Sequence, residues 1–283
     1  MTARTDAEER TSAERLRALE ELVDELARKL TETSRQVKTL ESELRNKVGG
    51  GGPRFASLYA DFTDQFRGST EEITAKLSGY LPDVHRLVRA SSGTGGVVDV
   101  GSGRGEWLSL LRDAGVTASG VDVNPAFVEA GCAQGLDLAH GDAVEHLLAL
   151  PPNSVHMVTA FHLIEHLDVE YLLAFLAAAR QVLRPGGCVL LETPNPHNLL
   201  MGACDFYNDP THLSPLPPAL TEYLVSASGF GEVEVRPLHP AESPLPTGDV
   251  GAPLQVENLV AVTLYGPQDY AVLGYKPQSV EDS

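Results

Sequence analysis

The fold is decided by one stretch of the sequence, Val97-Val-Asp-Val-Gly-Ser-Gly-Arg-Gly-Glu-Trp107. Three of its first four residues are valines, a composition typical of a strand that is buried on both faces. Three glycines then alternate with other residues, and the apolar residues after Glu106 recur at helical spacing. A strand, a glycine-rich turn and a helix in this order allow a ligand to approach the backbone, with the N–H groups of the helix directed at it.

The spacing of the glycines indicates which kind of ligand binds. Dinucleotide folds use Gly-x-Gly-x-x-Gly, and phosphate-binding loops end in a lysine followed by Ser or Thr. This stretch instead reads Asp-x-Gly-x-Gly-x-Gly and has no such lysine. The carboxylate of Asp99 would repel a pyrophosphate but suits a cationic ligand. A glycine-rich turn after a strand is common and does not by itself indicate a ligand. The identity of the ligand therefore has to be inferred from the flanking segments as well.

Those segments alternate between strands and helices, which predicts a parallel sheet with helices on both faces. A second strand ends at Asp122, where an acidic residue accepts hydrogen bonds from a ribose in such sheets. Ligands bind at the carboxyl ends of parallel strands, so the residues just beyond each end matter most. The other strands are expected directly before Asp142, at 155–161 and at 188–192. The last of these strands follows the segment Leu183-Arg-Pro-Gly-Gly.

In order and spacing, these segments resemble the class I S-adenosylmethionine (SAM) methyltransferases. The resemblance implies an α/β fold over residues 54–277, with a Rossmann-like seven-stranded sheet in the order 3-2-1-4-5-7-6 and SAM as the cofactor. It implies that Asp122 binds the SAM ribose, that Asp142 lies beside the adenine, and that Arg67 is a candidate partner of the SAM carboxylate. The expected SAM-binding residues are Arg67, Asp99, Gly101, Gly103, Asp122, Val123, Asp142, Ala143 and Phe161.

The composition limits the partners and the compartment. The chain has 283 residues, 39 of them acidic and 21 basic, and a formal net charge of −18. Such an acidic surface disfavours nucleic acid, because binding to phosphates uses Lys and Arg. Cys132, Cys188 and Cys204 have no paired spacing, which predicts buried free thiols in a reducing compartment. No apolar run reaches the roughly 18 residues of a membrane span, and the N-terminus is unlike a signal peptide, so we expect a soluble, cytoplasmic protein.

The N-terminal region predicts a coiled-coil helix over residues 6–48. From Leu16 to Lys47, a narrow, mainly apolar seam alternates spacings of three and four residues. Charged residues fill the other faces, which favours a coiled coil over a helix packed on its own domain. Gly49–Gly52 then predict a flexible linker over 49–53. We therefore expect a homo-oligomer that forms through this helix.

The remaining segments complete the expected domain. Residues 54–91 predict two or three helices, which lie over the SAM pocket in the family that the sequence resembles, with Phe62 and Phe66 as core residues. After the fifth strand come an insert rich in Pro, Asn and Asp and a helix, together residues 196–228. The last expected elements are a strand at 232–237, a helix at 254–264 and a strand at 270–275.

The methyl acceptor is expected to contact the loops after strands four and five. The first loop contains His162-x-x-Glu165-His166, and the second contains His212. His-x-x-Glu-His also occurs in one class of metallopeptidase, but inside a helix, whereas here it begins at a strand end, so we exclude a peptidase. At a helix start the three side chains would point the same way. Together with His212 they form a candidate site for a divalent metal.

A similar constellation occurs in the small-RNA 3′-terminal 2′-O-methyltransferases, which carry Glu-x-x-Glu-His after strand four, a further His after strand five, and a metal that binds the vicinal ribose hydroxyls. Here His162 replaces the first Glu, which favours a more borderline metal than Mg²⁺. Alternatively, no metal binds and one imidazole takes a hydroxyl proton. The candidate catalytic residues are His162, His166 and His212, and the candidate metal ligands are His162, Glu165, His166 and His212.

The acceptor class follows from a second resemblance. The stretch from Leu191 to Pro218, with Arg67-Gly-Ser and Arg104-Gly-Glu-Trp, resembles bacterial methyltransferases of surface-polysaccharide and secondary-metabolite clusters. Several of these are O-antigen chain-terminating or sugar methyltransferases, which implies O-methylation of a sugar or glycan hydroxyl. The alternatives are a small-molecule methyltransferase of quinone or antibiotic biosynthesis, an RNA 3′-terminal 2′-O-methyltransferase, and a scaffold that binds SAM without turnover.

Deleting residues 1–50 is predicted to lower the oligomeric state, because the heptad seam is the expected contact between chains. The affinity for SAM is predicted to stay unchanged. Light scattering of the full and the truncated chain at micromolar concentration measures the first effect, and calorimetry with SAM measures the second. A full-length chain that is monomeric under these conditions contradicts the prediction.

Overall fold

The computed structural model describes residues 58–59, 62–63, 65, 67–90, 95–242 and 256–278. The chain divides into two compact units, Met1–Tyr59 and Ala60–Ser283, and every element named below belongs to the second. The expected coiled-coil helix at 6–48, the linker at 49–53 and Phe66 lie outside the described residues, so they remain predictions. Within the described ranges, no helix is both long enough and apolar enough to cross a membrane.

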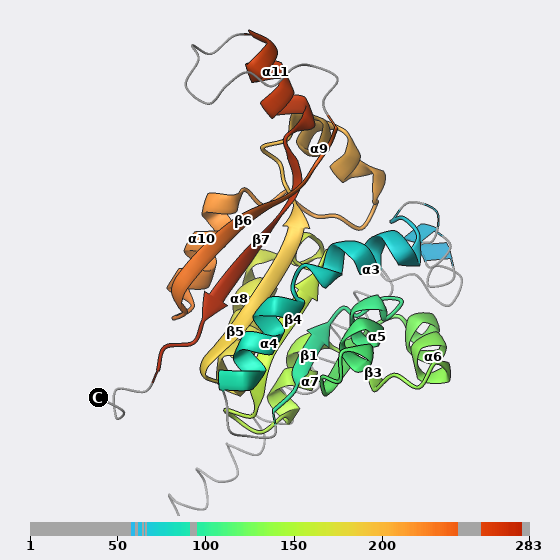
Figure 1. Ribbon diagram of the computed structural model, residues 1–283, viewed down its shortest axis with the longest axis vertical. Helices are drawn as coiled ribbons and strands as arrows, with labels where there is room; N and C mark the ends of the chain where they lie inside the picture. The colour runs from blue at the N-terminus through green and yellow to red at the C-terminus, as the bar shows by residue number, and fades with distance from the viewer. Residues whose placement is uncertain are drawn as a thin grey trace, which may run out of the picture. The chain divides into compact units, whose positions relative to one another are not determined.

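The centre of the fold is a seven-stranded sheet in the order β3-β2-β1-β4-β5-β7-β6, as predicted. Neighbours among β1 to β5 pair in parallel, whereas β7 is antiparallel to both β5 and β6. The carboxyl ends of the parallel strands therefore meet the amino end of β7 at one end of the sheet (Figure 1). The strands are β1 Val97–Val100, β2 Ala118–Asp122, β3 Leu138–His140, β4 Val155–Phe161, β5 Leu183–Pro194, β6 Gly231–Pro240 and β7 Pro267–Tyr275.

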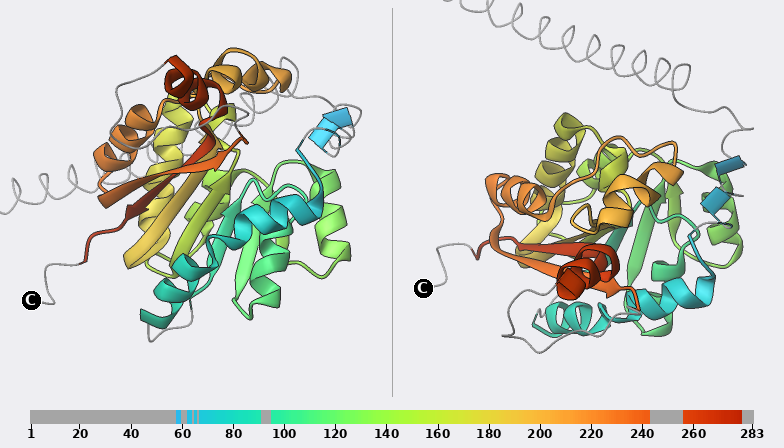
Figure 2. Two further views of the ribbon diagram at one scale, coloured as in Figure 1. Left: turned by 45° about the horizontal axis from the view of Figure 1, so that its top comes forward. Right: turned by 90° about the horizontal axis from the view of Figure 1, so that it is seen from above.

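Helices cover both faces of the sheet (Figures 1 and 2). The described helices are α3 Thr70–Ser78, α4 Leu81–Ala90, α5 Glu106–Asp113, α6 Pro125–Ala133, α7 Ala143–Ala149, α8 Val169–Val182, α9 Leu199–Ala203, α10 Pro218–Ala227 and α11 Val256–Tyr265, with 3₁₀ turns η1 Ile164–His166 and η2 Asp205–Asn208. One apolar core joins α7, α8 and α10 to strand residues such as Val158, and a second joins α3, α4 and α5 to residues such as Met157. Because neighbouring strand residues face opposite sides, β1, β4, β5 and β7 each contribute buried residues to both cores.

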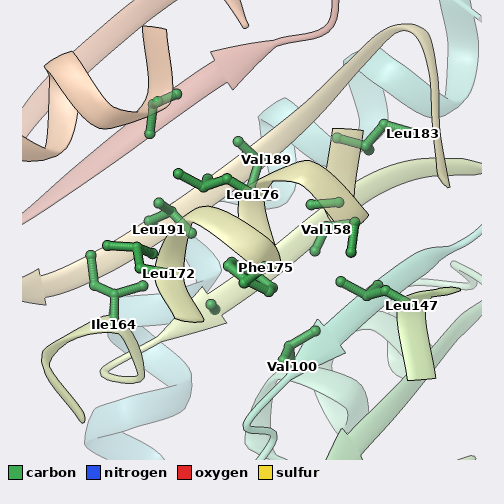
Figure 3. Packing of buried hydrophobic residues seen from close by; sticks show 14 of the residues in the cluster. Val100, Leu147, Val158, Ile164, Leu172, Phe175, Leu176, Leu183, Val189 and Leu191 are labelled. Atoms are coloured by element: carbon green, nitrogen blue, oxygen red, sulfur yellow. The ribbon is translucent and has the colours of Figure 1, made fainter. Parts of the chain in front are cut away.

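Helix α8 shows why the sequence forms these layers. Its N-cap is Asp168, whose carboxylate accepts a 2.8 Å hydrogen bond from the backbone N–H of Tyr171 and so satisfies a free donor of the first turn. Leu172, Phe175 and Leu176 recur at helical spacing and are buried in the first core (Figure 3). Burying each such side chain contributes ~1.5–3 kcal/mol, which holds the helix on the sheet.

Two segments near the carboxyl ends of the strands form what we call the cap, residues 195–217 and 256–266. Asn195 and Asn198 are buried and fasten the first segment to the chain around the second. Nδ2 of Asn195 donates to the carbonyl of Pro267 at 2.9 Å, and Nδ2 of Asn198 donates to the carbonyl of Gly266 at 3.0 Å. Helix α9 accordingly lies beside α11, beyond the end of β5 (Figures 1 and 2).

Two expectations from the sequence require correction. Strand β5 spans Leu183–Pro194 rather than 188–192, because Leu183 pairs with Val155 of β4 and the residues up to Pro194 pair with β7. All three cysteines are free, but only Cys188 is buried, while Cys132 and Cys204 are exposed. Cys188 lies in a central strand, whereas the two others lie in α6 and directly after α9, at the surface.

Candidate active site

The turn after β1 uses backbone conformations that glycine adopts easily. Gly101, Gly103 and Gly105 have φ values of +69°, +52° and +80°, in the region that disfavours a side chain. A Cβ at Gly101 would lie 2.9 Å from the side chain of Leu163, and a Cβ at Gly103 would lie 3.2 Å from Nη1 of Arg67. The turn therefore has no room for side chains, and a ligand can approach its backbone closely.

Two buried carboxylates flank this turn. Asp99 of β1 accepts a 2.7 Å hydrogen bond from Oγ1 of Thr159, and burial raises its pKa to about 7. Asp122 at the end of β2 accepts bonds of 2.8 Å from the N–H of Gly103 and 2.7 Å from the N–H of Asn124, and burial raises its pKa as well. The raised pKa values mean that hydrogen bonds and nearby positive charge only partly replace the hydration that these two carboxylates lose on burial. A cationic ligand or further hydroxyl donors would complete the compensation.

Arg67 supplies the charge opposite to these acids. Its Nη2 donates to the carbonyl of Phe161 at 3.4 Å, and its positive charge opposes the rise in the pKa of Asp99 and of Asp122. Its Nε is buried without a hydrogen-bond partner among the residues that the structure describes. Because an unpaired buried donor is costly, Arg67 fits a ligand that brings a carboxylate.

Three further residues expected to bind SAM lie at the same end of the sheet. Val123 directly follows β2 and is 70% exposed, as suits a side chain that covers a flat ring. Asp142 is the N-cap of α7, which Ala143 begins. The carboxylate of Asp142 also accepts a 2.6 Å hydrogen bond from the hydroxyl of Tyr171. The carboxylate of Asp142 therefore mainly stabilises the first turn of α7. We expect Asp142 to lie beside a bound ligand and not to bind it directly through this carboxylate.

Phe161 ends β4, and its side chain belongs to the core. The centroid of its ring lies 5.5 Å from those of Tyr80 and Trp107. Its carbonyl accepts the hydrogen bond from Arg67. Phe161 therefore contributes to the site through its backbone carbonyl and not through its side chain.

His162 follows β4 in an unusual backbone conformation, with a φ of +52°. Only Ile164–His166 form a helical turn, a 3₁₀ turn, so the three side chains of the His-x-x-Glu-His pattern do not share one helix face. Nδ1 of His162 lies 3.4 Å from Oε1 of Glu165, and its Nε2 lies 3.5 Å from Oε1 of Glu192 and 3.9 Å from Oδ1 of Asp269. His162 is thus enclosed by three carboxylates.

Two of these carboxylates were not among the residues selected from the sequence. Glu192 accepts a short hydrogen bond from the hydroxyl of Tyr80, and Asp269 lies 2.9 Å from Nδ1 of His239. Glu192 could have been selected from the sequence, because the fifth strand was expected to end there and ligands bind at the carboxyl ends of parallel strands. Asp269 could be found only from the antiparallel direction of β7, whose amino end lies beside Pro194.

The other two histidines form a second group around Glu165. Ligand atoms of Glu165, His166 and His212 all lie within 4.8 Å of one another, and the rings of His166 and His212 have centroids 4.7 Å apart. Oε2 of Glu165 accepts a 2.9 Å hydrogen bond from Thr193. Its Oε1 is buried without a hydrogen-bond partner in the described part of the chain and lies 3.9 Å from Nε2 of His212. The four residues expected to converge therefore form two groups that meet at Glu165.

Hydrogen bonds define which nitrogen of each imidazole carries the proton. Nδ1 of His212 donates to the carbonyl of Phe206 at 2.6 Å. The hydroxyl of Thr211 donates to Asp209 at 2.6 Å, so its oxygen accepts from Nδ1 of His166 at 2.9 Å. In their neutral forms both imidazoles therefore carry the proton on Nδ1 and present a bare Nε2.

The two groups differ in charge. Burial lowers the pKa of His162, but Glu165, Glu192 and Asp269 outweigh it and raise that pKa to about 10. Burial also raises the pKa of Glu165, but His162 lowers it overall, so Glu165 stays ionised. Burial lowers the pKa of His212. At neutral pH, His162 is a cation that cannot accept a proton, whereas His212 is a neutral base beside a carboxylate.

Comparison with known proteins identifies the family. A family model described as a methyltransferase domain matches residues 72–233. A probable SAM-dependent methyltransferase of Mycolicibacterium smegmatis is 35% identical over 140 residues, which are 49% of this chain and 52% of that protein. The chain thus aligns with about half the length of this curated relative.

Solved structures agree with this result. A SAM-dependent methyltransferase from Archaeoglobus fulgidus is 31% identical, with 77% of this chain and 99% of that chain covered and a TM-score of 0.66. A putative methyltransferase from Haloferax volcanii, solved in complex with the Trm112 methyltransferase activator, is 17% identical, with coverage of 80% and 97% and a TM-score of 0.54, and shows the shared fold alone. The chain belongs to the SAM-dependent methyltransferases and is an enzyme whose cofactor is SAM.

Proposed function

We propose that the chain transfers the methyl group of SAM to a hydroxyl of a sugar or glycan, with His212 as the general base. The observation that carries this proposal is the bare Nε2 of His212, 3.9 Å from the buried, ionised Oε1 of Glu165. A neutral imidazole next to a carboxylate suits proton removal from a hydroxyl near neutral pH.

The cofactor half of this proposal assigns roles to residues around β1 and β2. When bound, SAM supplies a methyl group on a positively charged sulfur, which makes the methyl carbon electrophilic. Asp122 would accept hydrogen bonds from the ribose hydroxyls, and the unpaired Nε of Arg67 would bind the carboxylate. The buried carboxylate of Asp99 would face the cationic portion of the ligand, and the glycine turn would leave room for it. Each assignment uses a group whose charge or hydrogen bonding is incomplete in the protein alone.

The acceptor half assigns the proton. The hydroxyl oxygen forms its bond to the methyl carbon while the bond from that carbon to sulfur breaks and its electron pair stays on sulfur. Nε2 of His212 takes the hydroxyl proton, and Oε1 of Glu165 stabilises the imidazolium that results. The bond from Nδ1 of His212 to Phe206 fixes the ring during this step. His162 is already a cation, so its role is to keep Glu165 ionised.

A sugar acceptor is supported by the resemblance of the stretch from Leu191 to Pro218 to bacterial polysaccharide methyltransferases. The net charge of −18 disfavours the RNA alternative. A small-molecule acceptor of the quinone or antibiotic type remains the alternative substrate class. Homo-oligomer formation through residues 6–48 and a cytoplasmic location are part of the same proposal.

A divalent metal is a second candidate for the same residues, and the unpaired Oε1 of Glu165 favours it. Two imidazoles and one carboxylate are a common ligand set for first-row metals. Glu165, His166 and His212 would supply that set. The hydrogen bond of His166 to the hydroxyl of Thr211 and that of His212 to the carbonyl of Phe206 would orient the two rings. His162 is not needed as a ligand, because its two nitrogens face Glu165, Glu192 and Asp269. A bound ion would lower the pKa of the acceptor hydroxyl.

Replacing Asp122 with alanine should weaken SAM binding roughly tenfold or more, because hydrogen bonds to a charged group contribute ~1.5–3 kcal/mol. Calorimetry with SAM measures the effect. Asp122→Asn is a second variant that keeps the size of the side chain. Its single amide oxygen can replace only one of the two carboxylate oxygens that accept from Gly103 and Asn124, so its affinity for SAM should also fall. Unchanged affinity in the alanine variant would contradict the assignment of Asp122 to the ribose.

Replacing His212 with alanine should reduce kcat about 100-fold or more, the range expected for loss of a general base, while SAM affinity stays within a few-fold. His197→Ala is the matched control, because His197 lies exposed in the same cap. Steady-state methyl transfer with and without a chelator separates the two mechanisms. Loss of activity with chelator and its return with added metal supports the ion, whereas no effect of chelator together with an inactive His212→Ala supports the base. Full activity in both treatments places the site elsewhere.

A further inference from the structure

The acceptor side of the molecule is nearly devoid of permanent positive charge. Between Arg184 and Lys276 the sequence contains a single Lys or Arg, Arg236. Arg236 is held by Asp83 at 2.5 Å and by Glu234 at 2.7 Å. The cap segments 195–217 and 256–266 contain no Lys or Arg at all. No side chain of the cap can therefore neutralise an anion through a guanidinium or an ammonium group.

The buried groups next to the proposed base add negative charge instead. Glu165, Glu192 and Asp269 are buried at this end of the sheet, and Asp209 lies 3.9 Å from Nε2 of His212. His162 faces all three buried carboxylates, and Asp269 is also influenced by His239 and Lys76. A nucleoside diphosphate brings two or more negative charges, and its recognition normally uses Arg, Lys or a metal clamp. In the metal-free mechanism, with His212 as the base, the acceptor side of this site opposes such a ligand.

The cap instead presents apolar side chains to solvent. They begin next to the base: Leu213 directly follows His212, its N–H donates to the carbonyl of Glu165 at 2.9 Å, and its side chain is 59% exposed. Nearly half of the exposed large apolar residues in the described chain lie in the cap, namely Leu199, Leu200, Tyr207, Leu213, Leu259 and Val262. Helix α9 contacts both η2 and α11, so these residues lie in one region of the cap. Exposed apolar groups that gather in one region mark a binding surface.

The charge of the cap indicates which partner covers this surface. Attraction to an anionic membrane requires Lys and Arg near the apolar residues, and the cap has none while the whole chain carries −18. Leu213, which belongs to this surface, directly follows the proposed base in the chain. The occupant that matches both facts is an apolar portion of the acceptor itself.

We propose that the acceptor is an uncharged glycoside that carries an apolar group, which rests on the cap while the sugar hydroxyl meets His212. This inference rests on the proposed hydroxyl methylation and adds the substrate class. It also places the reaction in order: a glycosyl transfer, which releases the sugar from its nucleotide carrier and attaches it to an apolar molecule, precedes methylation.

A matched set of acceptors tests the substrate class with the full chain. Glucose, mannose and rhamnose are each offered as the octyl glycoside below its micelle concentration, as the methyl glycoside, and as the nucleoside diphosphate sugar. Calorimetry with the protein saturated with S-adenosylhomocysteine measures binding, and transfer from labelled SAM measures kcat/KM. For at least one sugar, the octyl glycoside should bind roughly tenfold more tightly than the methyl glycoside, as burial of a few CH₂ groups would produce. The nucleoside diphosphate form should not bind measurably.

A pair of variants tests the location. Leu213→Ser should remove the advantage of the octyl glycoside over the methyl glycoside. Leu173→Ser is the control, because Leu173 is an exposed leucine of α8 outside the cap, and it should keep that advantage. Comparable binding of the octyl and methyl glycosides, or binding of a nucleoside diphosphate sugar at least as tight as that of the octyl glycoside, overturns the inference. If the predicted order of binding holds but no sugar is methylated, the proposed function fails and the inference about the apolar surface stands.

Discussion

The site depends on how buried carboxylates are compensated at one end of the sheet. Five parallel strands end there, and one antiparallel strand begins there. Ionised groups lose their hydration on burial, and this cost must be offset by hydrogen bonds or opposite charge. Asp99 and Asp122 lie at one half of this end and Glu165, Glu192 and Asp269 at the other. The two halves differ in how far the charges of their carboxylates are compensated within the protein. We infer that this difference suits one half to bind the cofactor and the other to remove a proton from the acceptor.

At the cofactor half, compensation is incomplete. Asp122 has two backbone donors, and hydroxyls of Thr159 and Ser102 serve Asp99, whose pKa is nevertheless raised. Within the described residues, Nε of Arg67 has no hydrogen-bond partner. A ligand with a positive charge, hydroxyls and a carboxylate completes all three, and SAM has this chemistry. At the acceptor half, His162 compensates the carboxylates within the protein. His212 is then left neutral, with Glu165 as a partner for the charge that it gains.

Local sequence patterns were sufficient for the central strands and the glycine turn, and the order of the strands followed from the resemblance to a known family. The valines before Gly101 and the glycines after them encode a local strand and turn, and local patterns are what single-sequence reasoning reads best. The acceptor site was predicted less well because its geometry is not local. A positive φ at His162 removes that ring from the face of His166, and no residue pattern announces it. Asp269 reaches the site only because β7 runs antiparallel beside β5.

The central claim is that, of two imidazoles in one site, His162 is charged and His212 is neutral, and an NMR spectrum tests it directly. A long-range ¹H–¹⁵N correlation spectrum of the full chain at neutral pH reports the protonation of each ring nitrogen. His162 should show two protonated nitrogens, because its carboxylate partners raise its pKa to about 10. His212 should show a protonated Nδ1 and a bare Nε2. A neutral His162, or a His212 with its proton on Nε2, would contradict the account.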